Sequence, residues 1–382
     1  MVYAESAVVV DGESGRILWS RDPGKKMFPA SITKIMTALL LLENTKPDQN
    51  LVAPSIVTEI PESSFHLAPG ELITAHDAGY ALMLRSANDV AMTIALALGR
   101  TQEGFAQMMN DRAKKLGCKN TNFVNPNGLH DERHYTTAED FALIARDAMS
   151  NNSFRAIAAA KTWTVIRSSG SKDLLVENKN KILQEDSSCE GIKTGFTNPA
   201  GKTFVGANSR NGWRTITVIL KTPNWEQDHK NLVKWAFDNF EQAPVPSGFE
   251  VVSKVVGDRR VSVATTVEGI SRMAIRKDGS EKLETQRVLS EEILSTKPGA
   301  PPKNDAPAPL AETPAAPKPA GVFNVLVNGT SVAQRPMMAA SEVTLGPADA
   351  KGRRDLSWLT IVIGVVVAGV AGLLVLRRGT KE

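Results

Sequence analysis

The chain has 382 residues, of which 42% are hydrophobic and 23% charged, and its formal net charge is +4. This composition is typical of a globular protein with room for two domains and additional segments. The sequence contains no long run of lysine and arginine, which argues against nucleic acid as a partner. Cys118 and Cys189 are too few for a disulfide framework and lack zinc-site spacing, so we interpret both as small buried or half-buried thiols.

The N-terminal part of the chain predicts a hairpin followed by helices. Apolar runs over residues 6–20 predict two strands around a turn at residues 11–15. A helix is expected over residues 31–43, because Pro29 suits the first helical turn. Apolar periodicity predicts further helices over residues 74–99, 101–116 and 136–149.

Strand patterns return after residue 160. Alternating and apolar runs predict strands over residues 161–166, 202–208 and 213–220, and Asn211-Gly212 predicts the turn between the last two. An amphipathic helix follows over residues 222–242. Strands therefore stand at both ends of a helical middle, and we expect the terminal strands to share one sheet.

A second, smaller domain is predicted after Pro244-Val245-Pro246. Short β patterns begin at Gly248, stop at a Pro/Ala-rich stretch over residues 296–320, and resume after it. Such a stretch cannot build a core. Because too few strands follow it to stand alone, we expect one small β domain over residues 248–346, interrupted by residues 296–320.

The C-terminal part predicts a membrane anchor. Trp358 to Leu376 is uncharged, and at about 1.5 Å per residue it is just long enough to cross a bilayer core of roughly 30 Å. Lysine and arginine flank it on both sides, so charge does not set its orientation. A stripe of small residues leaves a dimer open as an alternative: Gly364, Ala368 and Gly372.

The start of the chain lacks the basic and apolar regions of a secretory signal. Val2-Tyr3-Ala4 nevertheless looks like the tail of a cleavage site. We therefore expect that a signal peptide is missing from this sequence.

Three short motifs could carry chemistry together. In Ser31-Ile32-Thr33-Lys34, the serine and the lysine share one helix face, and a serine nucleophile needs an adjacent base. Ser86-Ala87-Asn88 offers a hydroxyl that could shuttle a proton and an amide that could hold a substrate. Lys193-Thr194-Gly195 offers a cation, a hydroxyl and a close backbone approach.

Each motif alone is as well explained by an ordinary capped helix, a polar kink or a surface turn. The trio in this order, however, is the one that class A β-lactamases and penicillin-binding proteins use. A lysine can act as a base only when it is neutral, and we expect the second cation, Lys193, to disfavour the charged form of Lys34.

Longer stretches around these motifs resemble the low-molecular-weight penicillin-binding proteins, the serine-type D-alanyl-D-alanine carboxypeptidases of peptidase family S11. The resembling stretches are FPASITKIMTALLLLE, LAPGELIT, SANDVA, NFVNPNGLHDERHYTTAEDFALIAR and GIKTGFTNPAGKTFV. The resemblance implies an α/β (α+β) fold of the β-lactamase/transpeptidase type over residues 1–242, a sheet flanked by a mostly helical subdomain. A small all-β domain and one C-terminal transmembrane helix would follow.

The resemblance also implies the reaction. A peptidoglycan stem peptide ending in D-Ala-D-Ala would acylate Ser31, the last D-Ala would leave, and water would hydrolyse the acyl-enzyme. Lys34 would be the base, Ser86 and Lys193 would complete the proton network, and the N–H groups of Ser31 and Phe196 would form the oxyanion hole.

The remaining implied partners and roles follow from the same resemblance. Asn88 would be one of the catalytic residues. The residues that bind substrate would be Thr194, Gly195, Phe196 and Lys179. β-Lactam antibiotics would be covalent inhibitors. The family needs no cofactor or metal. The chain would cross the cell membrane once, and the catalytic domain would lie on the outer side.

Two residues depart from the family pattern. Phe196 stands where many relatives carry histidine or tyrosine, which removes a polar side chain but keeps the backbone N–H. Lys179, in Asn178-Lys179-Asn180, stands where some relatives place a carboxylate-binding arginine. A point charge would then replace a bidentate fork.

Four alternatives remain open at this point. A penicillin-binding sensor or wall-binding protein with little turnover would carry the same motifs. A class A β-lactamase would need an E-x-x-L-N stretch, which the sequence lacks. A zinc peptidase is suggested by His130 and His134, but no third ligand cluster accompanies them. An esterase on the same scaffold rests on fold analogy alone.

Overall fold

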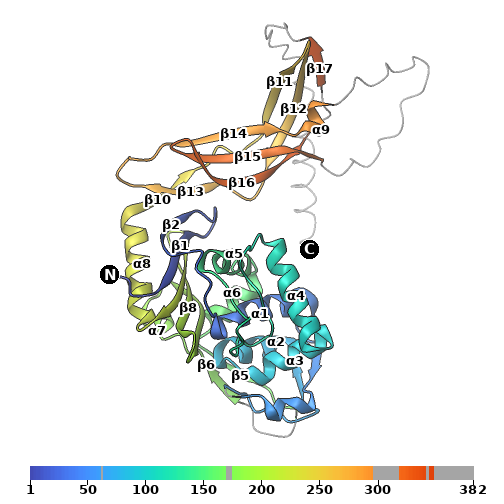
Figure 1. Ribbon diagram of the computed structural model, residues 1–382, viewed down its shortest axis with the longest axis vertical. Helices are drawn as coiled ribbons and strands as arrows, with labels where there is room; N and C mark the ends of the chain where they lie inside the picture. Colours follow the sequence, from blue (N-terminus) through green and yellow to red (C-terminus); the bar gives the residue numbers. More distant parts are fainter. Residues whose placement is uncertain (62, 169–173, 296–317, 341–343, 348–382) are drawn as a thin grey trace, which may run out of the picture. The chain divides into compact units, whose positions relative to one another are not determined.

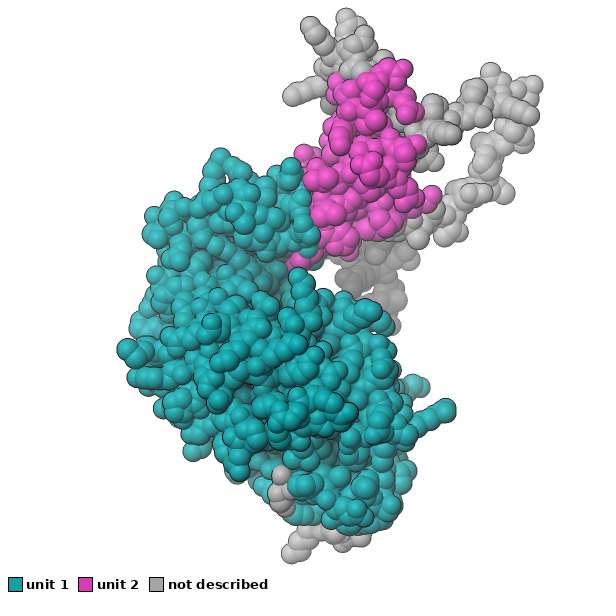
Figure 2. All heavy atoms as spheres, viewed as in Figure 1, with its two compact units in different colours: residues 1–246, 269–286, 324–334 teal, residues 247–268, 287–323, 335–382 magenta. Residues whose placement is uncertain are grey.

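The computed structural model describes residues 1–61, 63–168, 174–295, 318–340 and 344–347. The chain divides into two compact units, residues 1–246, 269–286 and 324–334 in the first and residues 247–268, 287–323 and 335–382 in the second (Figure 2). None of the helices in the described part of the chain is long and apolar enough to cross a membrane. The predicted membrane helix over residues 358–376 lies outside the described residues, as does most of the predicted insert over residues 296–320.

An antiparallel sheet of five strands forms the centre of the first unit (Figure 1). Its order is β2-β1-β9-β8-β7, so the first two strands pair with the last three and β7 lies at one end. The prediction that the terminal strands share one sheet is confirmed. The strands are β1 (Ser6–Asp11), β2 (Ile17–Arg21), β7 (Cys189–Thr197), β8 (Gly201–Arg210) and β9 (Trp213–Thr222).

The predicted turn at Asn211-Gly212 joins β8 to β9. Both residues have a positive φ, 53° for Asn211 and 78° for Gly212. A two-residue hairpin turn of this kind requires left-handed backbone at both positions, which asparagine and glycine tolerate best. The turn therefore sets the register of the two long strands behind the candidate site.

Helices cover both faces of this sheet. α8 (Trp225–Asn239) packs on β8 and β9, where Phe204, Leu232 and Phe240 belong to one apolar cluster. α5 (Ala138–Ala148) packs on β1 and β9. Its buried apolar side chains belong to a second cluster, which also contains Val205. Phe204 and Val205 are neighbours in β8 and serve the two opposite cores, as the alternation of a strand requires.

The helical part of this unit lies between β2 and β7 in the chain. Threonine side chains cap the start of three of its helices: Thr74, Thr101 and Thr137 each accept a hydrogen bond from a backbone N–H of the first turn. The elements are η1 (Ala30–Thr33), α1 (Lys34–Asn44), β3 (Asn50–Val52), η2 (Ser55–Glu59), β4 (Leu72–Thr74), α2 (Ala75–Tyr80), η3 (Ala81–Arg85), α3 (Asn88–Gly99), α4 (Gln102–Lys115), α6 (Asn152–Ala159), β5 (Thr162–Val165), β6 (Leu174–Glu177) and α7 (Ile182–Glu185).

The continuous helix predicted over residues 74–99 is wrong. α2 passes into a π-helical turn, η3, and ends at Ser86, whose φ of 66° is left-handed. Ala87 is extended, and α3 begins anew at Asn88. The apolar periodicity runs through the break, because the flanking residues on both sides are buried, and so the pattern could not reveal it.

The helix predicted over residues 31–43 is real but begins differently. Its first turn, η1, is a 3-10 helix, and the α-helical part starts only at Lys34. Ala30, directly before Ser31, has a φ of 52°. A left-handed alanine costs about 1–2 kcal/mol, and such strain is common where a side chain must be presented for chemistry.

The β patterns predicted after Gly248 are confirmed as strands. A sheet of order β11-β12-β16-β15-β14, with β17 on β12, contains strands from both sides of residues 296–317, and β10 pairs with β13. The elements are β10 (Phe240–Pro244), β11 (Glu250–Val256), β12 (Arg259–Val267), β13 (Arg272–Arg276), β14 (Leu283–Leu289), α9 (Glu291–Leu294), β15 (Pro319–Val327), β16 (Thr330–Ala339) and β17 (Thr344–Pro347).

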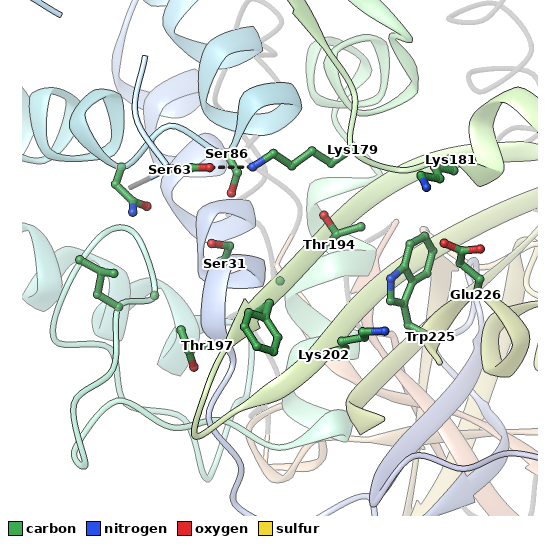
Figure 3. A pocket seen from close by; sticks show the side chains of 15 residues that line it. Ser31, Ser63, Ser86, Lys179, Lys181, Thr194, Thr197, Lys202, Trp225 and Glu226 are labelled. Carbon is green, nitrogen blue, oxygen red and sulfur yellow. Dashed lines mark hydrogen bonds between the residues drawn. The ribbon is translucent and has the colours of Figure 1, made fainter. Parts of the chain in front are cut away.

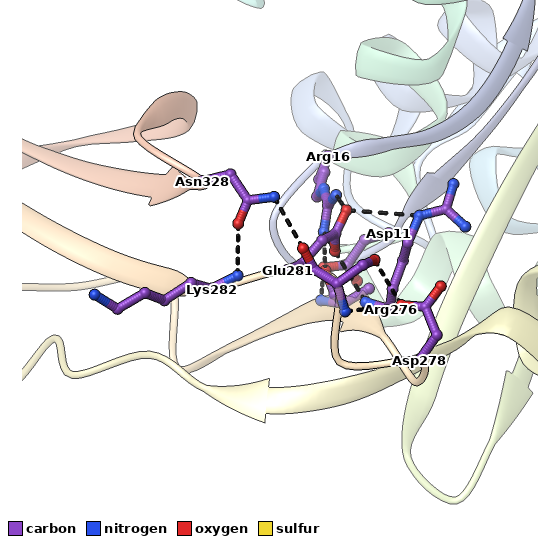
Figure 4. A network of polar contacts seen from close by, with 9 residues as sticks. Asp11, Arg16, Arg276, Asp278, Glu281, Lys282 and Asn328 are labelled. Atoms are coloured by element: carbon purple, nitrogen blue, oxygen red, sulfur yellow. Dashed lines mark hydrogen bonds and ion pairs between the residues drawn. The ribbon is translucent and has the colours of Figure 1, made fainter.

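A polar network ties the β1–β2 turn to the β13 segment inside the first unit (Figure 4). The buried Asp11 accepts hydrogen bonds from Ser14 Oγ at 2.5 Å and from the Ala274 N–H at 3.1 Å. Arg16 donates to Glu281 Oε2 at 2.9 Å and also contacts Oε1. These contacts attach residues 272–281 to the N-terminal hairpin.

Candidate active site

A cleft of about 580 Å³ lies between β7 and the helical part (Figure 3). Seven of the nine predicted site residues line it: Ser31, Ser86, Asn88, Lys179, Thr194, Gly195 and Phe196. The other two, Lys34 and Lys193, are buried lysines with exposed fractions of 0% and 2%. The structure thus brings together residues from η1, α1, the η3–α3 break, β7 and the loop after β6.

The side chain of Lys34 contacts Ser31. Its Nζ lies 3.1 Å from Ser31 Oγ. The same nitrogen donates to Asn88 Oδ1 at 2.7 Å and to the backbone carbonyl of Asn127 at 2.6 Å. A neutral amine has two N–H groups and one lone pair. With both N–H groups committed to these carbonyl oxygens, the lone pair is left for the hydroxyl hydrogen of Ser31.

The surroundings of Lys34 favour that neutral form. Burial, followed by the charges of Lys193 and Lys179, holds the pKa of Lys34 well below its ordinary range. The sequence motifs predicted that the charge of Lys193 would be the main cause of the lowered pKa of Lys34. The larger cause is the removal of the amine from water, and Lys193 comes second.

Lys193 lies on β7 with its side chain buried, and its Nζ donates to the Thr194 carbonyl at 3.0 Å. Burial and the charge of Lys179 lower the pKa of Lys193 to about 7. Lys193 therefore changes its charge near neutral pH. Thr194, the next residue, lines the cleft.

Gly195 allows β7 to lie against the turn that carries Ser31. A Cβ at this position would stand 2.4 Å from Thr203 Oγ1 and 2.9 Å from the Ser31 backbone nitrogen. The glycine therefore lets the chain's own η1 turn approach β7 closely. The close approach of a substrate backbone at Gly195, which lines the cleft, stays a prediction.

The break between η3 and α3 places Ser86 and Asn88 in the cleft wall. The left-handed Ser86 ends one helix, and the Asn88 side chain then points to Lys34. Asn88 is held from the other side as well: its Nδ2 donates to the Pro61 carbonyl at 2.9 Å, and its backbone N–H donates to the Ser63 carbonyl at 2.7 Å. Asp89 fixes the same segment by accepting from the Phe65 and Leu67 N–H groups.

The sequence-based reasoning missed the contribution of residues 125–129. The Asn127 carbonyl accepts from Lys34, and the Pro126 carbonyl accepts from Thr37 Oγ1 at 2.6 Å. Gly128 has a φ of 81°, and a Cβ there would lie 1.9 Å from the Ala30 carbonyl oxygen. The segment Asn-Pro-Asn-Gly was part of the family resemblance, but carbonyl oxygens carry no side-chain signal.

Lys179 stands at the mouth of the cleft. Its Nζ donates to Ser63 Oγ at 2.6 Å, the contact drawn in Figure 3. Ser63 itself lines the cleft and was not predicted. Phe196 is 61% exposed, so its ring forms part of the rim.

The histidines of the HDERH segment have separate partners. His134 is buried, its Nδ1 accepts from the Val124 N–H at 3.2 Å, and its Nε2 contacts Thr33 Oγ1 at 2.9 Å. Burial lowers its pKa to about 4. His130 contacts Glu132 at 3.2 Å. Both nitrogens of His134 are thus used within the protein, which argues against its serving as a zinc ligand.

Both cysteines are free thiols, Cys118 partly buried and Cys189 buried, as predicted. Burial raises the pKa of Cys118 to about 12 and also raises that of Cys189. Neither lines the cleft.

Comparisons with known proteins identify the family of the chain. Residues 1–224 match the profile of the D-alanyl-D-alanine carboxypeptidase family, peptidase S11. D-alanyl-D-alanine carboxypeptidase DacF of Bacillus subtilis is 28% identical over 279 residues, which cover 70% of this chain and 72% of that protein. A solved D-alanyl-D-alanine carboxypeptidase of Mycobacterium tuberculosis is 30% identical, with a TM-score of 0.59, over 62% of this chain and 92% of that one.

The likeness in fold extends further along the chain. Penicillin binding protein 5 of Haemophilus influenzae, at 22% identity, has a TM-score of 0.69 over 90% of this chain and 98% of its own. The α+β fold expected from the sequence is therefore confirmed. With the profile match over more than half of its length, the chain belongs to the D-alanyl-D-alanine carboxypeptidase family, peptidase S11.

Proposed function

We propose that this D,D-carboxypeptidase removes the terminal D-alanine from peptidoglycan stem peptides through an acyl-enzyme on Ser31. The single observation that supports this most is the environment of Lys34, a buried amine with two carbonyl acceptors and a serine hydroxyl 3.1 Å away. An amine held in this way can take a proton from a serine at neutral pH, which an exposed lysine cannot.

In the acylation step, Ser31 Oγ attacks the carbonyl carbon of the penultimate D-alanine while its proton passes to Lys34. The oxygen that becomes negative lies between the N–H groups of Ser31 and Phe196, which stabilise it. Ser86 then passes the proton to the amine of the leaving D-alanine. The C–N bond breaks, and water later attacks the ester on Ser31, with Lys34 again as base.

The terminal carboxylate of the substrate is the group that distinguishes a carboxypeptidase from other peptidases. We assign its recognition to the hydroxyl of Thr194 and to the charges of Lys193 and Lys179. β-Lactams carry a carboxylate in a corresponding place, and they acylate Ser31 through the same contacts. Asn88 and the edge of β7 hold the amide on the other side of the scissile bond.

Mass spectrometry after treatment with benzylpenicillin tests the nucleophile. We expect one adduct, on the peptide that contains Ser31, and none in Ser31→Ala. Release of D-alanine from a pentapeptide then separates a carboxypeptidase from a sensor, which would be labelled stoichiometrically without turnover. An adduct at another residue would overturn the assignment of Ser31.

We further propose that residues 358–376 form a membrane anchor that places the catalytic domain, residues 1–242, on the outer side of the cell membrane. The uncharged stretch in the sequence supports this, and a wall substrate requires it. The β domain over residues 248–346 then acts as a stalk. Carbonate extraction of cell membranes tests the anchor: the full chain should stay in the pellet, whereas a chain that ends at residue 357 should be released.

A further inference from the structure

We propose that Ser63 is a positioning residue for acylation: its hydroxyl fixes Lys179 at the mouth of the cleft while its backbone carbonyl fixes Asn88 against Lys34. This inference rests on the function proposed above and adds a residue to it. Ser63 lies outside all three motifs, those that begin at Ser31, Ser86 and Lys193. It lies in the segment between η2 and β4, and its hydroxyl contact reaches across the cleft while its carbonyl contact stays on the helical side.

The hydroxyl contact joins the two walls of the cleft. Ser63 is on the helical side, and Lys179 is on the loop that leads from β6 to α7. The Nζ–Oγ distance of 2.6 Å is that of a strong, charge-assisted hydrogen bond. The Lys179 loop is itself held in place, because Asn178 Nδ2 donates to the Ala160 carbonyl at 2.9 Å. The hydrogen bond therefore restrains a long, flexible lysine at the mouth of the cleft.

The backbone contact connects the same serine to the base. The Ser63 carbonyl accepts from the Asn88 N–H at 2.7 Å, and Asn88 Oδ1 accepts from Lys34 Nζ at 2.7 Å. Lys34 in turn contacts Ser31 Oγ at 3.1 Å. A continuous chain of four contacts thus runs from the cation at the mouth to the nucleophile, and Ser63 supplies two of them.

The position of Lys179 matters because its charge acts on both buried lysines. It lowers the pKa of Lys34 and that of Lys193. The Coulomb energy between charges falls with distance and with access of water. If Lys179 were released into solvent, its effect on both groups would weaken, and their pKa values would rise.

Ser63→Ala isolates the hydroxyl, because it leaves the backbone contact to Asn88 intact. The second-order rate constant for acylation by a fluorescent penicillin is measured on the full chain from pH 5 to 10. We expect a loss of about tenfold at pH 7, the usual effect of one hydrogen bond to a charged group. The acid limb of the profile should move to higher pH. Ser63→Thr, which keeps the hydroxyl, should restore both.

A double-mutant cycle with Lys179→Met decides whether Ser63 acts through Lys179. If it does, Ser63→Ala adds no further loss in the Lys179→Met background. Independent losses that multiply, or a Ser63→Ala profile that superimposes on the wild-type one, would overturn the proposal. Ser55→Ala, an exposed serine of η2 outside the cleft, is the matched control.

The same experiment separates this inference from the function on which it rests. If the wild-type chain is not acylated, or if Ser31→Ala is still labelled, the proposed function fails. If labelling requires Ser31 but the Ser63 and Lys179 losses multiply, the function stands and the role of Ser63 is wrong. Thermal unfolding of each variant, followed by circular dichroism, shows whether a loss of rate comes from a loss of fold.

Discussion

At the scale of single residues, the site depends on two lysines that are buried at a cost in stability. Lys34 and Lys193 are almost fully shielded from water, and the pKa of each lies below its ordinary range. Motif spacing predicted both residues and their proximity. It could not predict that burial, more than mutual repulsion, would lower the pKa of Lys34, because burial depends on segments far away in sequence, such as Asn127.

The first prediction concerns pH and the substrate carboxylate. Because the pKa of Lys193 is about 7, this residue loses its positive charge as the pH rises above that value. We expect kcat/KM for a peptide ending in free D-Ala-D-Ala to fall by about tenfold above pH 7, as a contact with a charged group is lost. The corresponding peptide amide, which has no carboxylate, should show no such fall. Parallel profiles for the two substrates would contradict the assigned role of Lys193.

The second prediction concerns stability. The folded-state pKa of Lys193 lies below its unfolded value, so the unfolded chain binds more protons between about pH 7 and 10, and wild-type stability rises with pH in that window. Lys193→Met removes the buried amine and should raise the free energy of unfolding at pH 7 by about 1–4 kcal/mol while activity is lost.

Urea unfolding at pH 7 and at pH 9.5 measures this effect. The difference between Lys193→Met and the wild type should shrink at the higher pH. Lys202→Met, which replaces an exposed lysine of β8, should show no such pH-dependent difference. A variant that is less stable than the wild type at both pH values would show that packing, and not desolvation, dominates at this site.

At the scale of secondary-structure elements, periodicity predicted most helices and strands but not the breaks that create the site. The strands β8 and β9 and the helices α4, α5 and α8 follow from apolar patterns and turn residues. The η3–α3 break does not, because buried residues continue through it. Ser86 lines the cleft with a left-handed backbone, and an ordinary serine gives no sign of that in sequence.

The third prediction concerns the packing of β7 on η1. In Gly195→Ala the added methyl group would lie 2.4 Å from Thr203 Oγ1 and 2.9 Å from the Ser31 nitrogen, so the strand must move away. We expect a loss of stability of about 1–3 kcal/mol, as for other overpacked sites. Acylation should fall by about 100-fold, because a shift near 1 Å in the reacting groups has an effect of this size.

A glycine in open surroundings provides the comparison for this variant. A Cβ on Gly248 would have no atom within 4 Å, so Gly248→Ala should leave both stability and acylation unchanged. Fluorescent-penicillin labelling and chemical unfolding measure the two quantities. Wild-type acylation in Gly195→Ala would mean that the Ser31 turn does not need its contact with β7.

At the scale of the whole chain, the sequence predicted the order of its parts and could not predict how they are joined. The network around Asp11 links the first strand to residues more than 260 positions later, as in the Asp11–Ala274 hydrogen bond. Long-range pairs of this kind leave no periodic signal. In the sequence, single polar residues in turns, such as Arg16 and Glu281, have the pattern of surface residues. In the structure both side chains are largely buried, with exposed fractions of 10% and 11%.

The fourth prediction tests the contact between Arg16 and Glu281. Burial alone would raise the pKa of Glu281, but hydrogen bonds from Arg16 and from the Arg276 N–H hold it below its usual value of 4.5. Its stabilising effect is therefore present above pH 4.5 and is lost as the pH falls through the lower, folded-state value. Glu281→Gln should lower the free energy of unfolding at pH 7 by about 1–3 kcal/mol.

The pH dependence gives the check. The difference between Glu281→Gln and the wild type should vanish at low pH, where the wild-type carboxylate is protonated as well. Glu284→Gln breaks an exposed pair with Lys282 and should change stability by less than about 1 kcal/mol. Equal effects of the two substitutions would show that the Arg16–Glu281 pair is no more important than an ordinary surface pair.

The two glycine contacts at the site also bear on how drug resistance could arise. Gly195 lies against the Ser31 turn and Gly128 against Ala30, with no room for a methyl group at either position. Selection by β-lactams cannot easily reshape the floor of the pocket, because a larger residue there would collide with the turn that carries Ser31, the proposed nucleophile. Resistant variants that keep their wall activity should therefore cluster at the rim, where the exposed Phe196 lines the cleft.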